Sequence, residues 1–264
     1  MNTNRSTDVV LRDIRDGVAI LTLNRPDRLN AWTPAMEARY FGLLEDAAAD
    51  PAVRVIVVTG AGKGFCAGVD MDALKDIGAG GTFEHSGKPQ TFPLTIPKPI
   101  IAAINGACAG LGLVQALMCD LRFAAAGVKL TTAFVRRGLV AEHGISWVLP
   151  RLVGPARALD LLLSGRVILA DEALAMGLVN RVVAPDALLE TALSYARELV
   201  TSCSPSAMAS IKYQVYRHYE TDLATALGET NEIMAASLKR PDFREGVASF
   251  VERRAPQFAP FAKL

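Results

Sequence analysis

Residues 98–124 read KPIIAAINGACAGLGLVQALMCDLRFA, and this stretch decides the fold. The apolar run 100–104 is typical of a strand that is buried on both faces of a parallel sheet. The small residues of 105–110 predict a loop, which feeds a helix that reaches about Cys119, and 121–125 predicts a further strand. Alternation of strand, loop and helix in this way is typical of an α/β fold.

A second stretch of the same kind lies earlier in the chain. Residues 53–71 read VRVIVVTGAGKGFCAGVDM, in which 53–59 predicts another buried strand and 64–70 a second Gly-rich junction. Small residues let a ligand approach the main chain closely, and amide groups near the start of a helix can bind negative charge. Two such amides that converge on one point would form an oxyanion hole. Gly-rich turns between strands and helices are also common without any ligand.

The flanking sequence extends this organisation. Residues 9–11 and 18–23 predict two strands joined by a turn, and Thr33-Pro34 predicts the start of a helix that runs to about Ala49. From about residue 154 helical periodicity dominates, in the segments 155–163, 171–177, 186–201, 205–218 and 221–239, with short strands near Val167 and at 181–183. We expect a core of residues 1–200 and a C-terminal helical region of residues 201–264. The polar, Gly-rich stretch 78–93 predicts either a functional lid or a surface loop.

The composition narrows the class of protein. The net charge of +1 over 264 residues argues against a nucleic-acid-binding surface. None of the four cysteines has C-x-x-C spacing and the three histidines lie far from any cysteine pair, so we expect no metal site and reduced thiols. The first eight residues are polar, and no apolar run reaches the roughly 18 residues of a membrane span. We expect a cytoplasmic protein without a nucleic-acid or membrane partner.

The chain from residue 18 to about residue 254 resembles the enoyl-CoA hydratase/isomerase (crotonase) superfamily. The matching segments are the two stretches above, LTLNRPDRLNAW at 21–32, LLLSGRVILADEALAMGLVNRVV at 161–183 and FREGVASFVERRAPQF at 243–258, in the family's order and spacing. The resemblance implies an α/β fold built as a ββα spiral with a C-terminal α-helical trimerisation region. It also implies an acyl-CoA thioester substrate, no cofactor besides the coenzyme A of that substrate, and a homotrimer or dimer of trimers.

The resemblance further implies an oxyanion hole formed by the backbone N–H groups of Val69 and Leu111. Many family members have glycine at the second position, but a side chain is tolerated because the contact is a main-chain N–H. Leucine at this position resembles the peroxisomal type of Δ3,Δ2-enoyl-CoA isomerase. The hydratases of the family use two glutamates, whose positions are occupied here by Val114 and Phe134. A two-glutamate hydration mechanism is therefore not expected.

Glu142 is the carboxylate that the resemblance favours. It lies in GLVAEHG at 138–144 and aligns with the catalytic glutamate of the peroxisomal-type isomerases, and with a nucleophilic aspartate in a related dehalogenase. We expect Glu142 to be buried among apolar neighbours, namely Leu111, Phe134, Leu139 and Val140. The alternative is a surface residue beside the helix expected near 146–152. His143 is a candidate for a second acid/base group or a substrate contact, or it points away from the site.

Basic residues should bind the phosphates and ribose of coenzyme A. Arg28 and Lys63 are the candidates from the N-terminal part, with ordinary solvated charges as the alternative. Ala67 and Asp70 of the first junction are assigned to coenzyme A contacts, although Asp70 also fits a cap of the following helix. In the family, the C-terminal helix of a neighbouring subunit contributes to this site; the matching segment here contains Phe250 and Arg253.

The leading interpretation of the activity is Δ3,Δ2-enoyl-CoA isomerisation. One carboxylate suffices for this reaction, because the same group can remove a proton at C2 and return it at C4. The alternatives are an enoyl-CoA hydratase that uses Glu142 with or without His143, an enzyme of coenzyme A thioester hydrolysis or C–C cleavage, and a catalytically silent acyl-CoA-binding protein.

Overall fold

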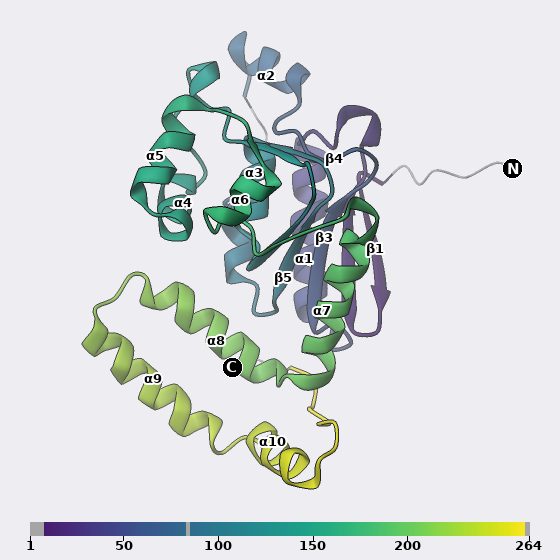
Figure 1. Cartoon of the computed structure of the whole chain (residues 1–264), viewed down its shortest axis with the longest axis vertical. Coiled ribbons are helices and arrows are strands. Elements are labelled where there is room, and N and C mark those ends of the chain that lie inside the picture. The colour runs from purple at the N-terminus through teal and green to yellow at the C-terminus, as the bar shows by residue number, and fades with distance from the viewer. Residues whose placement is uncertain (1–7, 83–84, 262–264) are drawn as a thin grey trace, which may run out of the picture.

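The strands of the computed structural model, which describes residues 8–82 and 85–261, form two sheets (Figure 1). In the six-stranded sheet the order is β1-β2-β3-β5-β7-β10, with β1 antiparallel to β2 and the other neighbours parallel. Its strands are β1 (Val10–Arg15), β2 (Val18–Leu23), β3 (Val55–Gly60), β5 (Ile100–Ile104), β7 (Leu121–Ala125) and β10 (Arg181–Val183). The four-stranded sheet contains β4 (Gly64–Cys66), β6 (Ala107–Ala109), β8 (Lys129–Thr131) and β9 (Ile168–Leu169).

A strand–strand–helix unit repeats along the chain. The large-sheet strands β3, β5 and β7 are each followed directly by a small-sheet strand, β4, β6 or β8. Helix α2 (Met71–Gly78) follows β4, and α3 (Leu111–Leu117) follows β6. After β8 come the 3-10 turn η3 (Val135–Arg137) and α4 (Ile145–Val153). The predicted ββα spiral is therefore confirmed, but the two junctions, which the sequence predicts as loops, also contain the paired strands β4 and β6.

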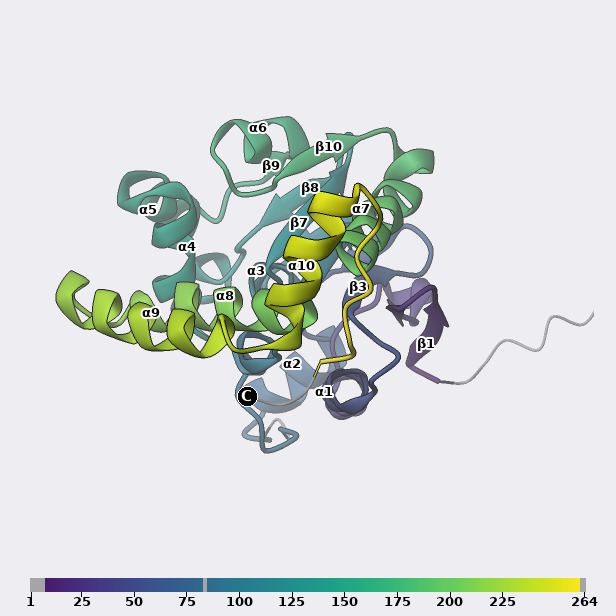
Figure 2. The same cartoon turned by 90° about the horizontal axis from the view of Figure 1, so that it is seen from below.

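The central strands are buried because helices pack against the sheet. All five residues of β5 are buried, as the apolar run predicts. Helix α1 (Pro34–Ala49) begins where predicted, with the Thr33 side chain accepting a hydrogen bond from the Met36 amide. Helix α7 (Leu188–Ser202) packs on β2, β3, β5 and β7, and Figures 1 and 2 show α1 and α7 on different sides of β3.

The remaining short elements lie around this core. They are the helices α5 (Pro155–Ser164) and α6 (Ala170–Ala175) and the 3-10 turns η1 (Pro26–Arg28), η2 (Phe92–Thr95) and η4 (Pro185–Ala187). All four cysteines are free, and three of them are buried. Within the described residues, no helix is long and apolar enough to cross a membrane, and no group of three histidine, cysteine, aspartate or glutamate residues is arranged to hold a metal ion.

The last three helices extend away from the sheets (Figure 1). They are α8 (Pro205–His218), α9 (Leu223–Ser237) and α10 (Pro241–Glu252). Lys212 on α8 lies 2.8 Å from the Asp120 carboxylate, and the Tyr216 hydroxyl donates to the same carboxylate, so α8 is tied to the core just before β7. The boundary that the sequence predicts at residue 200 falls in the last turn of α7.

Helix α3 can pack against the small sheet only because residue 112 is glycine. A Cβ added at Gly112 would lie 2.1 Å from the Cys66 carbonyl oxygen, a main-chain atom that cannot move without disturbing β4. We expect Gly112→Ala to lower the free energy of unfolding by about 3 kcal/mol or more, as measured by denaturant unfolding. Gly42→Ala is the matched control, since Gly42 lies in helix α1 and the new methyl group would have no atom within 4 Å apart from the adjacent residues and backbone of its own helix. A Gly112→Ala protein as stable as the wild type would contradict this packing.

Candidate active site

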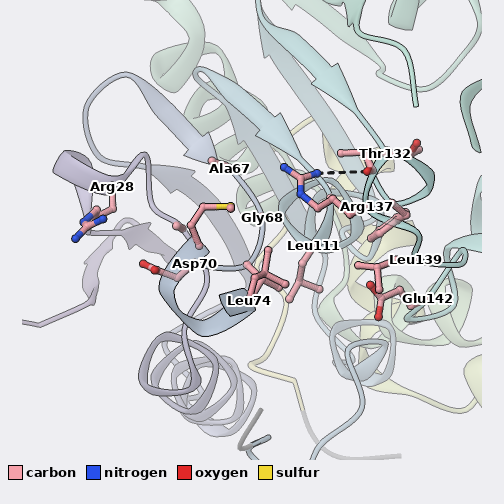
Figure 3. A pocket seen from close by; sticks show the side chains of 16 residues that line it. Arg28, Ala67, Gly68, Asp70, Leu74, Leu111, Thr132, Arg137, Leu139 and Glu142 are labelled. Atoms are coloured by element: carbon pink, nitrogen blue, oxygen red, sulfur yellow. Dashed lines mark hydrogen bonds between the residues drawn. The ribbon is translucent and has the colours of Figure 1, made fainter. Parts of the chain in front are cut away.

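A cavity of about 250 Å³ opens between the two Gly-rich junctions and the loop that follows β8 (Figure 3). The first junction and α2 form one side, the start of α3 lies in the middle, and residues 132–142 form the other side. The lining residues are Arg28, Ala31, Ala67, Gly68, Val69, Asp70, Met71, Leu74, Gly110, Leu111, Thr132, Ala133, Phe134, Arg137, Leu139 and Glu142. In Figure 3, Leu111 lies between Leu74 on one side and Leu139 and Glu142 on the other.

The two junctions bring unbonded main-chain amides to this cavity. Within the described chain, the amides of Val69 and Leu111 donate to no acceptor. Their neighbours differ: the Asp70 amide donates to the Trp32 carbonyl oxygen, and the Gly110 amide donates to the Thr131 carbonyl oxygen. Gly68 and Gly110 precede the two free amides with φ of 97° and 50°, conformations that glycine adopts without strain. Main-chain amides without a protein acceptor bind water or a ligand, so a pair of them in one cavity indicates a place for an external acceptor.

Asp70 holds the first junction in shape. Its side chain accepts a hydrogen bond from the Asp72 amide and caps α2, and its carboxylate lies 2.9 Å from the Arg25 guanidinium. Burial would raise the pKa of Asp70, but the Asp72 amide and the Arg25 charge outweigh burial and lower the pKa below its ordinary value. The capping role that the sequence offered as an alternative is the one this geometry shows. A contact of Asp70 with coenzyme A stays a prediction.

Glu142 reaches the cavity from a loop with an unusual backbone. Gly138, His143 and Gly144 all have positive φ, at 69°, 59° and 79°, which turns the chain sharply on both sides of the glutamate. Glu142 and Asp70 are the carboxylates among the described lining residues, and Asp70 is occupied by its cap and ion pair. Among the described lining residues, Glu142 is therefore the carboxylate that neither caps a helix nor pairs with an arginine.

The Glu142 side chain is not buried among apolar neighbours, contrary to the prediction from the sequence. Its side chain remains 35% exposed, and the neighbouring Val140 is 78% exposed rather than packed over it. The expectation was wrong because the tight turn directs Val140 to solvent, which periodicity cannot predict. Val114 is fully buried in α3 and absent from the described cavity lining, whereas Phe134 lines the cavity, so both hydratase glutamate positions carry apolar side chains.

His143 lies beside Glu142 but is not among the described residues that line the cavity, so a role in catalysis or substrate contact stays a prediction. The two side chains are 3.4 Å apart, between His143 Nε2 and Glu142 Oε2. Burial lowers the pKa of His143, and the Glu142 charge offsets only part of that effect, so the neutral imidazole is favoured near pH 7. The ring also packs edge-on against His85, with 6.4 Å between ring centroids.

The residues assigned to coenzyme A are only partly gathered at the cavity. Arg28 and Ala67 line the cavity. Arg28 lies at one end of it (Figure 3), and its side chain is 61% exposed. Lys63 is not among the described lining residues. Phe250 and Arg253 lie at the end of α10, outside this lining, so their assignment depends on a neighbouring subunit and stays a prediction. Arg137, which no sequence pattern marked as a site residue, lines the end of the cavity opposite Arg28 and donates a hydrogen bond to the Ala133 carbonyl oxygen.

Comparisons with known proteins agree with this arrangement. Residues 13–260 match the enoyl-CoA hydratase/isomerase family. The chain is 36% identical over 261 residues to 1,2-epoxyphenylacetyl-CoA isomerase of Escherichia coli, covering 95% of this chain and 98% of that protein. It resembles the structure of an enoyl-CoA hydratase from Mycobacterium marinum at 53% identity and TM-score 0.70, covering 79% and 97% of the two chains. An enoyl-CoA hydratase structure from Mycobacterium tuberculosis matches at 32% identity and TM-score 0.88, covering 96% and 99%.

The ββα spiral and the cavity between its junctions define an α/β enzyme of the crotonase fold. The chain belongs to the enoyl-CoA hydratase/isomerase family, as its match over residues 13–260 shows. The family includes both hydratases and isomerases, so membership alone does not determine which reaction this chain catalyses.

Proposed function

We propose that this protein is an enoyl-CoA isomerase that shifts a double bond from the Δ3 to the Δ2 position, with Glu142 as the acid/base. The observation that carries the proposal is the pairing of two free amides with one available carboxylate in a single cavity. The substrate is an acyl-CoA thioester, in keeping with the family and with the coenzyme A thioester named for the E. coli relative.

The proposed reaction begins with removal of a proton from C2 of a 3-enoyl thioester by Glu142. The electrons move onto the thioester oxygen, where the amides of Val69 and Leu111 donate hydrogen bonds to the developing charge. Each such donor contributes about 3–4 kcal/mol in acyl-transfer enzymes. Glu142 then returns the proton at C4 as the double bond forms between C2 and C3, so no second carboxylate is needed.

Product analysis tests the proposal. The protein is incubated separately with a 3-enoyl-CoA and a 2-enoyl-CoA, and the products are separated by chromatography. An isomerase converts the 3-enoyl thioester to the 2-enoyl thioester without adding water. Formation of 3-hydroxyacyl-CoA from the 2-enoyl thioester would instead establish hydration. Stoichiometric acyl-CoA binding without turnover of either substrate would favour the catalytically silent alternative.

Enoyl-CoA hydration is a second candidate, favoured by His143. Hydration requires a base that activates water and an acid that protonates C2. The Glu142–His143 pair, 3.4 Å apart, supplies two groups that exchange protons, although neither occupies the positions of the hydratase glutamates. The Mycobacterium marinum structure, at 53% identity, is named as a hydratase.

We also propose that the C-terminal helices join subunits into a trimer or a dimer of trimers. Leu223, Leu227, Met234 and Leu238 lie at spacings of four and seven along α9, which places them on one face, and all are about half or more exposed. An apolar stripe of this length on a surface marks a contact site. A neighbouring subunit would cover it and bring Phe250 and Arg253 near a coenzyme A site.

Charge on this stripe is expected to dissociate the oligomer. The double variant Leu227→Asp/Met234→Asp places two carboxylates in the contact, which desolvation disfavours strongly. Sedimentation velocity should show the wild type at three or six times the 28.1 kDa chain mass and the variant mainly as a monomer. Leu163→Asp is the matched control, because Leu163 is 71% exposed on α5 and lies outside the C-terminal helices. A wild-type monomer would refute the proposal.

A further inference from the structure

A buried carboxylate lies outside the cavity and has no role in the reaction described above. Glu37, in the first turn of α1, has a side chain that is 0% exposed. An ionised carboxylate is rarely buried completely unless its oxygens are paired or hydrogen-bonded. The charge of Glu37 therefore depends on the groups that face its two oxygens.

Hydrogen-bond donors surround both oxygens of Glu37. Oε1 accepts from the Ser86 amide at 2.7 Å, and Oε2 accepts from Gln90 at 2.5 Å and from the Trp32 indole at 3.3 Å. Burial would raise the pKa of Glu37, but these hydrogen bonds outweigh burial and lower the pKa below its ordinary value. Glu37 is therefore a fixed negative charge inside the protein.

This charge is connected to the active site through two imidazoles. His85 Nδ1 lies 3.4 Å from Glu37 Oε1, and the His85 ring packs edge-on against His143. His143 in turn lies 3.4 Å from Glu142. Gln90 also accepts a hydrogen bond from Gln115 on α3 at 2.6 Å, so the same cluster touches the helix that begins with Leu111.

We infer that Glu37 is a positioning residue of the active site: together with His85 it sets the orientation and charge of His143, and thereby the surroundings of Glu142. The inference rests on the proposed function, because it takes Glu142 to be the group that transfers the proton. Glu37 itself is not among the described residues that line the cavity.

Removal of Glu37 and removal of His85 should shift the pKa of His143 in opposite directions. Among the described residues, three titratable groups face its imidazole: Glu142 from its own loop, His85 from the segment before η2, and Glu37 from α1. The negative charge of Glu37 favours the imidazolium, so its removal should lower the pKa of His143. A protonated His85 disfavours the imidazolium, so replacement of His85 by a neutral residue should raise the pKa of His143.

Titration of the histidines by NMR measures this connection without any substrate. The chain has only three histidines, so selective ¹³C labelling of the imidazoles gives three signals, and His85→Gln identifies one of them. We expect Glu37→Gln to lower the pKa of His143, and His85→Gln to raise it. Glu45→Gln is the matched control, because Glu45 lies on the same helix and pairs with Lys88 of the same segment.

The pH profile of turnover provides the second readout. If the active form has a neutral His143 beside an ionised Glu142, the acidic limb of kcat should move to lower pH in Glu37→Gln and to higher pH in His85→Gln. At the pH optimum, Glu37→Gln should lower kcat roughly tenfold through loss of orientation, with KM nearly unchanged. His85→Gln retains the buried carboxylate, so it keeps the inference testable if Glu37→Gln does not fold.

The outcomes separate the inference from the proposed function. Unchanged His143 titration in folded His85→Gln protein and in folded Glu37→Gln protein would overturn the inference, whatever reaction the enzyme catalyses. Opposite shifts in the two variants, with Glu45→Gln like the wild type, would support it. If those shifts occur but the wild type converts neither enoyl-CoA, the proposed function is wrong while the connection between Glu37 and His143 is supported.

Discussion

Replacement of Glu142 by glutamine is expected to lower kcat by roughly 10²–10⁴-fold, the usual contribution of a positioned acid/base group. Glutamine keeps the size and the hydrogen-bonding capacity of the side chain but cannot accept the proton from C2. Binding of an acyl-CoA should change little, because the amides of Val69 and Leu111 and the coenzyme A contacts remain. Steady-state kinetics with a 3-enoyl-CoA and calorimetric titration with a saturated acyl-CoA measure the two effects separately.

Two further variants sharpen this prediction. His143→Ala should cost less than Glu142→Gln if the imidazole only assists, and the two losses should not add, because the side chains are in contact. Asp70→Asn should mainly weaken the first junction, since Asp70 caps α2 and pairs with Arg25. An unimpaired Glu142→Gln enzyme would move the chemistry to His143, Asp70 or a bound water, and would remove the main reason to prefer isomerisation.

Leu111→Pro is expected to lower kcat by roughly 10²–10³-fold, the effect of deleting one oxyanion donor. Proline has no backbone N–H, so this substitution removes the hydrogen-bond donor, which every other substitution would leave in place. The position tolerates proline better than most, because Leu111 is the first residue of α3 and its amide has no acceptor within the described chain. The rate should fall with little change in acyl-CoA binding, since the amide acts mainly on the charge that develops in the reaction.

Leu111→Ala is the control for the lost side chain. It keeps the amide and shortens a side chain that is only 3% exposed, so it should reduce stability but retain most of the activity per folded molecule. Thermal unfolding of both variants checks that each is folded at the assay temperature. Equal rates for Leu111→Pro and the wild type would show that this amide does not stabilise the enolate.

Local sequence patterns predicted most of the core elements. The run 100–104 is strand β5, Thr33-Pro34 begins α1, and 181–183 is β10, because burial and capping leave signals in consecutive residues. The short strands β4 and β6 were missed. Strands of three residues have too few positions to show a period, and their identity depends on a partner far away in the chain.

The sequence by itself determined the α/β alternation, the two junctions and, through resemblance, the candidates Val69, Leu111 and Glu142. Only the tertiary structure decided that the two amides lack acceptors and share one cavity with Glu142, that Val140 faces solvent, and that Lys63 lies outside the described lining. Only the tertiary structure showed that the Glu37 carboxylate, on helix α1, lies next to His85, which in turn packs against His143 about a hundred residues further along the chain. Hydrogen bonds and electrostatic fields act through space, so no pattern of neighbouring residues could have predicted that cluster.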